Sequence, residues 1–245
     1  IMSNPVLNSN FAAQERVLDA EPMTISGAIN KILVLLACVF AGAGYTWYLL
    51  LNGFGDKAMG LGVVGAIVAL ITSLIIIFTR GNTAKFLSPV YAAAEGLFLG
   101  SISYYFDSAW RGVVIEAVAG TFIVTFVMLM LYKAQIIRYT EKFQAVLMTA
   151  MLSVVAIYII QFIASFFDRG IPGIFEAGMV GIVFSLIVVG IAAMALIQDF
   201  WFIEEGAKNM MPKDMEWYAA FGLMLTLVWL YLEILRLLAK LNSRN

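Results

Sequence analysis

The sequence predicts an all-α membrane protein, a seven-transmembrane-helix bundle, on three observations. The 245 residues are 62% hydrophobic and only 13% charged, whereas soluble domains carry roughly 45–50% apolar and about 25% charged residues. The mean hydropathy is +0.94, and the apolar runs reach the ~20 residues that a spanning helix needs. Strands of a membrane β-barrel would be about 10 residues of alternating polarity, so helices are expected.

Charged residues divide the chain into seven apolar runs, which are expected to form one transmembrane domain over residues 27–241. A polar tail over residues 1–26 precedes this domain. No cleavable signal peptide is expected, because the first hydrophobic run starts only after Lys31. The expected spans are 30–53, 58–79, 86–106, 111–132, 143–167, 173–198 and 217–240.

The connections between these runs carry most of the charge and indicate the orientation. Most are short, but residues 133–142 and 199–216 form longer, charged loops. Gly206 and Pro212 are expected to break any helix in the second of these loops. Lys and Arg are more numerous on the N-terminal side of the spans than on the opposite side, which predicts a cytoplasmic N-terminus.

The composition also excludes several classes of function. The chain has no histidine, which removes the commonest general base and the commonest transition-metal ligand. Its single cysteine, Cys38, is expected to be a buried apolar residue, and no nucleophile elbow is present. We therefore expect no enzyme and no cofactor. A net charge of −1 argues against nucleic acid as a partner, and Lys240 lies too close to the end of its run for a Schiff-base photoreceptor.

Carboxylates within the spans are the feature that calls for a functional explanation. Glu95 lies in the middle of the third run, and Glu233 lies inside the last run, in LVWLYLEILRLL. An acid at the centre of a spanning helix costs about 2.5–3.5 kcal/mol on insertion scales. Glu233 can form an ion pair with Arg236 on the same helix face; a partner from another helix, or a wet cavity, is the favoured alternative. Asp199 is expected to close the sixth helix.

Four short stretches resemble the Bax inhibitor-1 family (the transmembrane Bax inhibitor motif), in a bacterial branch. They are SNPVLN near the start, EGLFLG in the third run, IQDFWFIEEG after the sixth, and EWYAAFGLMLTLVWLYLEILRLL in the seventh. The resemblance extends over residues 3–240. It implies six helices around a central seventh, in the bacterial inner membrane.

The resemblance further implies a pH-sensitive calcium leak channel that is gated by a pair of carboxylates. When the family's positions are carried over to this sequence, the pair is Asp199 on the sixth helix and Glu233 on the seventh. The arginine that competes for Asp199, the latch arginine, is then Arg80. The same two acids are the candidate ligands for Ca²⁺, the expected permeant ion. The further candidates on the ion pathway are Glu95, Glu204 and Glu205.

Physical chemistry gives such a pair a mechanism and also tests its geometry. Two carboxyl groups in a low-dielectric site cannot both ionise cheaply, so they would share a proton. Loss of that proton would create an oxygen site for a hard cation. If the chain reverses at Pro212, however, Asp199 is level with about residue 225 and Glu233 lies roughly 12 Å deeper. The pair then meets only if the loop is irregular or the reversal comes nearer residue 216.

A different class of function is a non-transporting interaction protein that modulates a membrane protease or a stress response. Its docking surfaces would be the polar tail, residues 2–26, and the charged loop, residues 199–216. The expected partners are therefore the lipid bilayer, calcium ions and protons, and a membrane protease as a candidate protein partner.

Overall fold

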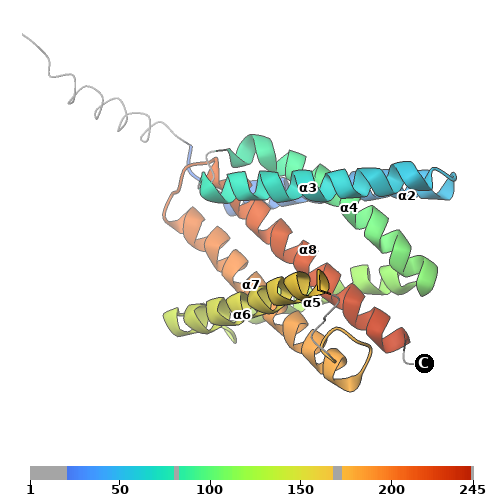
Figure 1. Cartoon of the computed structure of the whole chain (residues 1–245). Coiled ribbons are helices and arrows are strands. Elements are labelled where there is room, and N and C mark those ends of the chain that lie inside the picture. The colour runs from blue at the N-terminus through green and yellow to red at the C-terminus, as the bar shows by residue number, and fades with distance from the viewer. Residues whose placement is uncertain (1–20, 80–82, 168–172, 244–245) are drawn as a thin grey trace, which may run out of the picture.

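The computed structural model describes residues 21–79, 83–167 and 173–243, and seven helices account for most of them. No strand occurs within these segments; Pro22 and Pro212 form an isolated antiparallel bridge. The helices are α2 (Ile25–Leu51), α3 (Gly55–Phe78), α4 (Ala84–Ala109), α5 (Val113–Lys133), α6 (Glu141–Ser165), α7 (Met179–Lys208) and α8 (Met215–Asn242). The all-helical prediction is thus confirmed (Figure 1).

Local sequence explains several of the helix ends. Thr24 and Thr140 precede α2 and α6, and their side chains accept hydrogen bonds from the backbone N–H groups of Gly27 (2.9 Å) and Phe143 (3.2 Å). Such caps satisfy donors that have no partner within the helix. Gly112, before α5, has a φ of 87°, a conformation that glycine adopts without steric cost. It permits the tight turn between α4 and α5.

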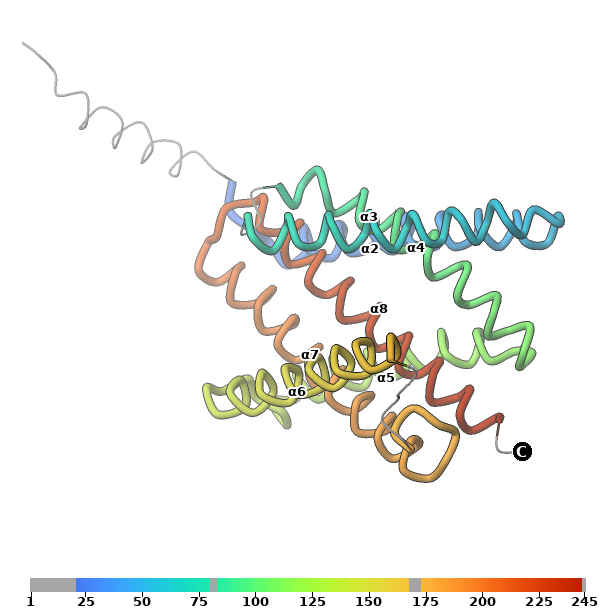
Figure 2. The backbone as a smooth tube through the Cα atoms, in the orientation of Figure 1, coloured from blue at the N-terminus to red at the C-terminus, as the bar shows by residue number. Residues whose placement is uncertain are grey.

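Successive helices run in opposite directions, so the connections alternate between the two ends of the bundle (Figures 1 and 2). We call the end with the α7–α8 connection the inner end, and the end with the α2–α3 connection the outer end. In the same views α2 and α3 lie on one side, α5 and α6 lie on the other, and α7 and α8 cross obliquely between them.

Six of the seven described helices are long and apolar enough to cross a membrane; α4 is not among them. Instead, α4 packs closely against α2 and α3. A Cβ atom added at Gly96 would lie 2.3 Å from the Val39 carbonyl oxygen of α2, and one at Gly100 would lie 2.6 Å from that of Ala43. These glycines therefore allow backbones to approach closely, as in many membrane helix pairs. The protection by α2 and α3 explains how a less apolar helix is accommodated.

Helix α8 is the most enclosed of the six candidate spans, with 67% of its most apolar stretch buried. It packs on α2, α4, α5 and α7, whereas α3 packs on α4 and α2, and α6 packs on α7. The arrangement of six helices around a central seventh is therefore not confirmed.

Helix α7 differs from the predicted sixth span, 173–198, at both ends. It begins only at Met179 and continues to Lys208, so Asp199 lies within the helix and does not close it. Gly206 does not break the helix: a Cβ atom there would lie 2.9 Å from the Met23 sulfur, so this position accommodates the chain before α2. Pro212 lies in the connection, as expected.

The non-helical segment before α7 is held by a buried lysine at the outer end of α8. The Lys240 ammonium donates to the carbonyl oxygens of Ile174 (2.9 Å) and Gly181 (3.0 Å), and to the Ser185 hydroxyl (3.0 Å). All three of its protons are thereby used. This lysine therefore has a structural role that its position near the end of the last run did not reveal.

Candidate functional site

Asp199 lies on α7 where this helix faces the first half of α8. A Cβ atom added at Gly222 of α8 would be 3.7 Å from Asp199 Oδ1. The Thr226 hydroxyl lies beside the same carboxylate and donates to the Gly222 carbonyl oxygen (3.3 Å). Oδ2 is shielded from the surface, and no group in the described part of the chain donates a hydrogen bond to it. An unpaired carboxylate oxygen is therefore buried between two helices.

This carboxylate lines a cavity of about 300 Å³ between α7 and α8. Gln198, Tyr218 and Thr226 contribute polar side chains to the wall. Ile77 of α3 and Met151 of α6 also contribute to the lining. Most of the lining is apolar, but the volume is large enough for water, and the Asp199 carboxylate and these three polar side chains can form hydrogen bonds with it.

Glu233 lies in very different surroundings, with only 2% of the residue exposed. Arg236 Nη1 donates to both carboxylate oxygens, at 3.0 Å each. The Tyr158 hydroxyl of α6 donates to Oε1 (2.8 Å), and the Trp229 indole N–H approaches the same oxygen at 3.3 Å. The intrahelical ion pair and the partner from another helix, which the sequence left as alternatives, therefore both occur.

The predicted pair of acids is not brought together in this structure. In the described residues, no hydrogen bond joins Asp199 to Glu233. Asp199 lies level with residues 222–226, as reversal at Pro212 predicts. Glu233 is two turns beyond Thr226, about 10 Å farther along the axis at 1.5 Å per residue. Arg80, the predicted latch arginine, lies outside the described residues.

The remaining candidate acids lie apart from the cavity wall. Glu95 is half-buried on α4, near Tyr91. Glu204 accepts a hydrogen bond from the Tyr132 hydroxyl (2.6 Å) and forms an ion pair with Lys208 (2.7 Å). Glu205 accepts a hydrogen bond from the Asn209 amide (3.0 Å). No group of three or more Asp, Glu, Cys or His side chains in the described segments is arranged to hold a metal ion.

Sequence reasoning missed a buried ion pair at the inner end of the bundle. Glu216 is fully buried at the start of α8 and receives hydrogen bonds from Lys31 Nζ (2.7 Å) and from the Thr24 N–H (3.0 Å) and hydroxyl (3.1 Å). A Cβ atom at Gly27 would collide with this carboxylate. Lys31 and Glu216 both border predicted spans on the side predicted to be cytoplasmic. Their common depth in the membrane could have suggested from the sequence that they form an ion pair.

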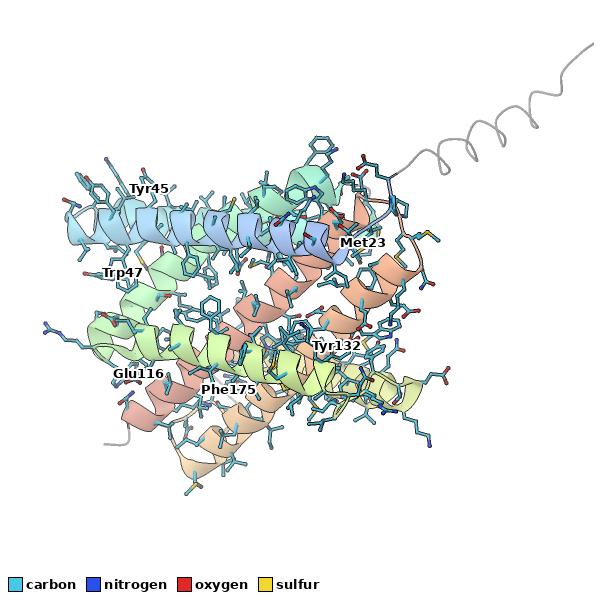
Figure 3. All side chains as sticks on the ribbon, turned by 180° about the vertical axis from the view of Figure 1, so that it is seen from behind. Met23, Tyr45, Trp47, Glu116, Tyr132 and Phe175 are labelled. Carbon is cyan, nitrogen blue, oxygen red and sulfur yellow. The ribbon has the colours of Figure 1, made fainter. Side chains whose placement is uncertain are left out.

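Beside this ion pair, residues 21–23 pair with residues 211–213 of the α7–α8 connection; we call this pairing the strap. The Met23 N–H donates to the Met211 carbonyl (2.7 Å), and the Lys213 N–H donates to the Glu21 carbonyl (3.0 Å). The side chains of Glu21 and Lys213 form an exposed ion pair. The hydrogen bond and the charge of Lys213 lower the pKa of Glu21, and Glu21 in turn raises the pKa of Lys213. The strap therefore fixes the chain that enters α2 against the inner end of the bundle (Figure 3, Met23).

Comparison with known proteins gives one family. A family model described as Bax inhibitor 1 like matches residues 4–243. A search of curated proteins finds no match. The matched range contains Asp199, Glu233 and all of the described residues. Together with the six candidate spans, this match indicates an integral membrane protein.

Proposed function

The chain belongs to the Bax inhibitor 1 like family, and on this premise we propose that it is a pH-sensitive leak channel for calcium and other cations. The proposal places the chain in the bacterial inner membrane with its N-terminus in the cytoplasm. The observation that carries it is the Asp199 carboxylate, which has a buried oxygen without a hydrogen-bond donor among the described residues and lines a cavity of about 300 Å³.

Asp199 suits the role of a proton-sensitive cation site. A buried carboxylate with one unpaired oxygen is costly when charged, so its charge depends on whether a proton, water or a cation reaches that oxygen. Calcium prefers oxygen ligands, and the Gln198 amide, the Thr226 hydroxyl and water can add to the carboxylate. A single carboxylate with neutral oxygens favours transient occupation, as a permeation pathway requires.

The pair of acids that the sequence predicted would need a large rearrangement to form the gate. Glu233 would have to leave Arg236 and Tyr158, and α8 would have to slide by about two turns, or ~10 Å. The proposal therefore assigns the proton switch to Asp199 and treats the Glu233–Arg236–Tyr158 cluster as an anchor between α6 and α8.

The inner end of α7 supplies acidic residues where a cation would enter. Glu204 and Glu205 follow Asp199 by one to two turns towards the α7–α8 connection. Acidic side chains at the mouth of a path raise the local concentration of cations. In the proposal these two residues attract the ion, and Asp199 accepts it inside the membrane.

Calcium flux into dye-loaded proteoliposomes across pH 5–9 tests the proposal. We expect a sigmoidal pH dependence in the wild type, which Asp199→Asn flattens and Glu233→Gln leaves in place. A wild-type profile in Asp199→Asn would overturn the assignment of the switch. A profile flattened by both substitutions would restore the pair as the gate. Absence of flux at every pH from correctly folded protein would refute the leak and favour the interaction protein.

A further inference from the structure

A second cavity, of about 310 Å³, lies in the outer half of the bundle. Its walls come from α2, α4, α5 and α8, and it extends along α2 from Leu36 to Trp47. We call it the crevice. Figure 3 looks onto the face where α2 and α5 run across the molecule, with Trp47 labelled just below α2. The crevice shares no lining residue with the cavity around Asp199.

The lining of the crevice is apolar, and its few hydroxyl groups are already engaged. Ser103 and Tyr231 hydrogen-bond to each other (2.6 Å), and Thr121 donates to the Ala117 carbonyl of its own helix (2.7 Å). A polar solute would therefore lose its hydrogen bonds to water without replacing them. An apolar cavity of this kind stays free of water, and unfilled space forfeits dispersion contacts along its walls.

The position of the crevice identifies what surrounds its mouth. Phe40 and Phe122 line it and are 52% and 46% exposed, on helices that are candidate membrane spans. The mouth therefore opens towards the hydrocarbon of the bilayer. Leu36 to Trp47 covers about 17 Å of helix at 1.5 Å per residue, close to the ~15 Å of one leaflet of a hydrocarbon core about 30 Å thick. Trp47, near the outer end of α2, lies where aromatic residues meet the lipid headgroups.

We propose that the crevice binds one acyl chain of a phospholipid from the outer leaflet, held between α2 and α5. The chain enters from the side, and the headgroup stays near the level of Trp47. Leu99 and Leu227, at the crevice wall, are only 6% and 8% exposed. They are therefore shielded from the surrounding lipid and are reached only by a chain that has entered.

Photocrosslinking of the reconstituted full chain tests this site. The probe is a phosphatidylcholine with a diazirine in one acyl chain, in vesicles of phosphatidylcholine and phosphatidylglycerol. We expect crosslinks at Leu99 and Leu227, mapped by peptide mass spectrometry. Crosslinks restricted to exposed residues such as Phe40 and Phe122 would overturn the proposal, because they report only the surrounding lipid.

Two glycines provide a matched pair of variants. A Cβ atom at Gly44, which lines the crevice, or at Gly60 of α3, which does not, would meet no atom of the described segments within 4 Å. Gly44→Phe should fill the crevice and reduce labelling of Leu99 and Leu227 severalfold, whereas Gly60→Phe should leave it unchanged. Undiminished labelling in folded Gly44→Phe would contradict the site, and Gly44→Leu repeats the test with a smaller side chain. If a free fatty acid with a diazirine labels Leu99 and the phosphatidylcholine probe does not, the ligand of the crevice is a free fatty acid and the phospholipid proposal is wrong.

Discussion

Asp199 and Glu233 are both carboxylates on apolar helices, and the fold surrounds them in opposite ways. Glu233 has an arginine, a tyrosine and a tryptophan within hydrogen-bonding distance. Asp199 has one shielded oxygen without a donor in the described chain, beside a cavity. Because a buried charge is tolerated when it is paired and hydrogen-bonded, Glu233 needs no functional explanation, whereas Asp199 does.

The same contrast separates the two ends of the bundle. The cavity that contains Asp199 and a few other polar side chains lies towards the inner end, between α7 and α8, and the almost wholly apolar crevice lies towards the outer end, between α2 and α5. The two cavities share no lining residue, so the proposed ion site and the proposed lipid site occupy separate parts of the bundle.

The largest expected effect comes from removing the partner of Glu233. Arg236→Ala removes the positive charge beside the Glu233 carboxylate, and Glu233 is only 2% exposed. Breaking a fully buried pair costs about 3–5 kcal/mol; because the Arg236 side chain is 38% exposed, we expect about 2 kcal/mol less unfolding free energy. Thermal unfolding in detergent measures the loss.

The double variant Glu233→Gln/Arg236→Ala is the control for this prediction. It removes both charges, so it should recover part of the stability that Arg236→Ala loses. An Arg236→Ala protein as stable as the wild type would show that Glu233 does not depend on its arginine, and the contrast with Asp199 would fail.

An intermediate effect, on flux, is expected from Gly222→Ala. The added methyl group would lie 3.7 Å from Asp199 Oδ1, an ordinary contact that narrows the cavity without a clash. Alanine in place of glycine inside a helix stabilises by roughly 0.5–1 kcal/mol. We therefore expect unchanged or higher stability together with slower calcium flux in proteoliposomes.

Gly190→Ala on α7 separates these two contributions. A Cβ atom at Gly190 would meet no described residue within 4 Å, so this variant should gain the same helix propensity and keep wild-type flux. Equal flux in Gly222→Ala and Gly190→Ala would argue against a path that passes Asp199.

The sequence was sufficient to predict the helices and the level of Asp199, but not the partners of the buried charges. Apolar runs and a proline in the last long connection are local features, so they placed Asp199 near residue 225, and the structure agrees. The hydrogen bond from Tyr158 to Glu233 joins residues on α6 and α8, and that of Lys31 to Glu216 joins α2 and α8. Such contacts depend on how helices pack, which hydropathy does not determine.

The extension of α7 past residue 198 shows the same limit. Charged residues after Asp199 suggested a loop, yet the helix continues to Lys208, with Glu204 and Lys208 paired one turn apart. An i,i+4 pair of this kind supports a helix outside the apolar run. The end of a membrane span and the end of a helix are therefore different predictions, and only the first follows from hydropathy.

The smallest expected effect on calcium flux comes from Glu21, an exposed acid that forms an ion pair with Lys213 at the inner end. Pairing with Lys213 lowers the pKa of Glu21, so its contribution to folding is present above the ordinary carboxyl pKa and is lost only as the pH falls through the lowered value. No change in its charge is therefore expected between pH 5 and 9. Glu21→Gln should leave the pH profile of calcium flux superimposable on that of the wild type, because the backbone hydrogen bonds of the strap remain. A displaced profile would mean that the strap, and not Asp199 alone, takes part in the pH response.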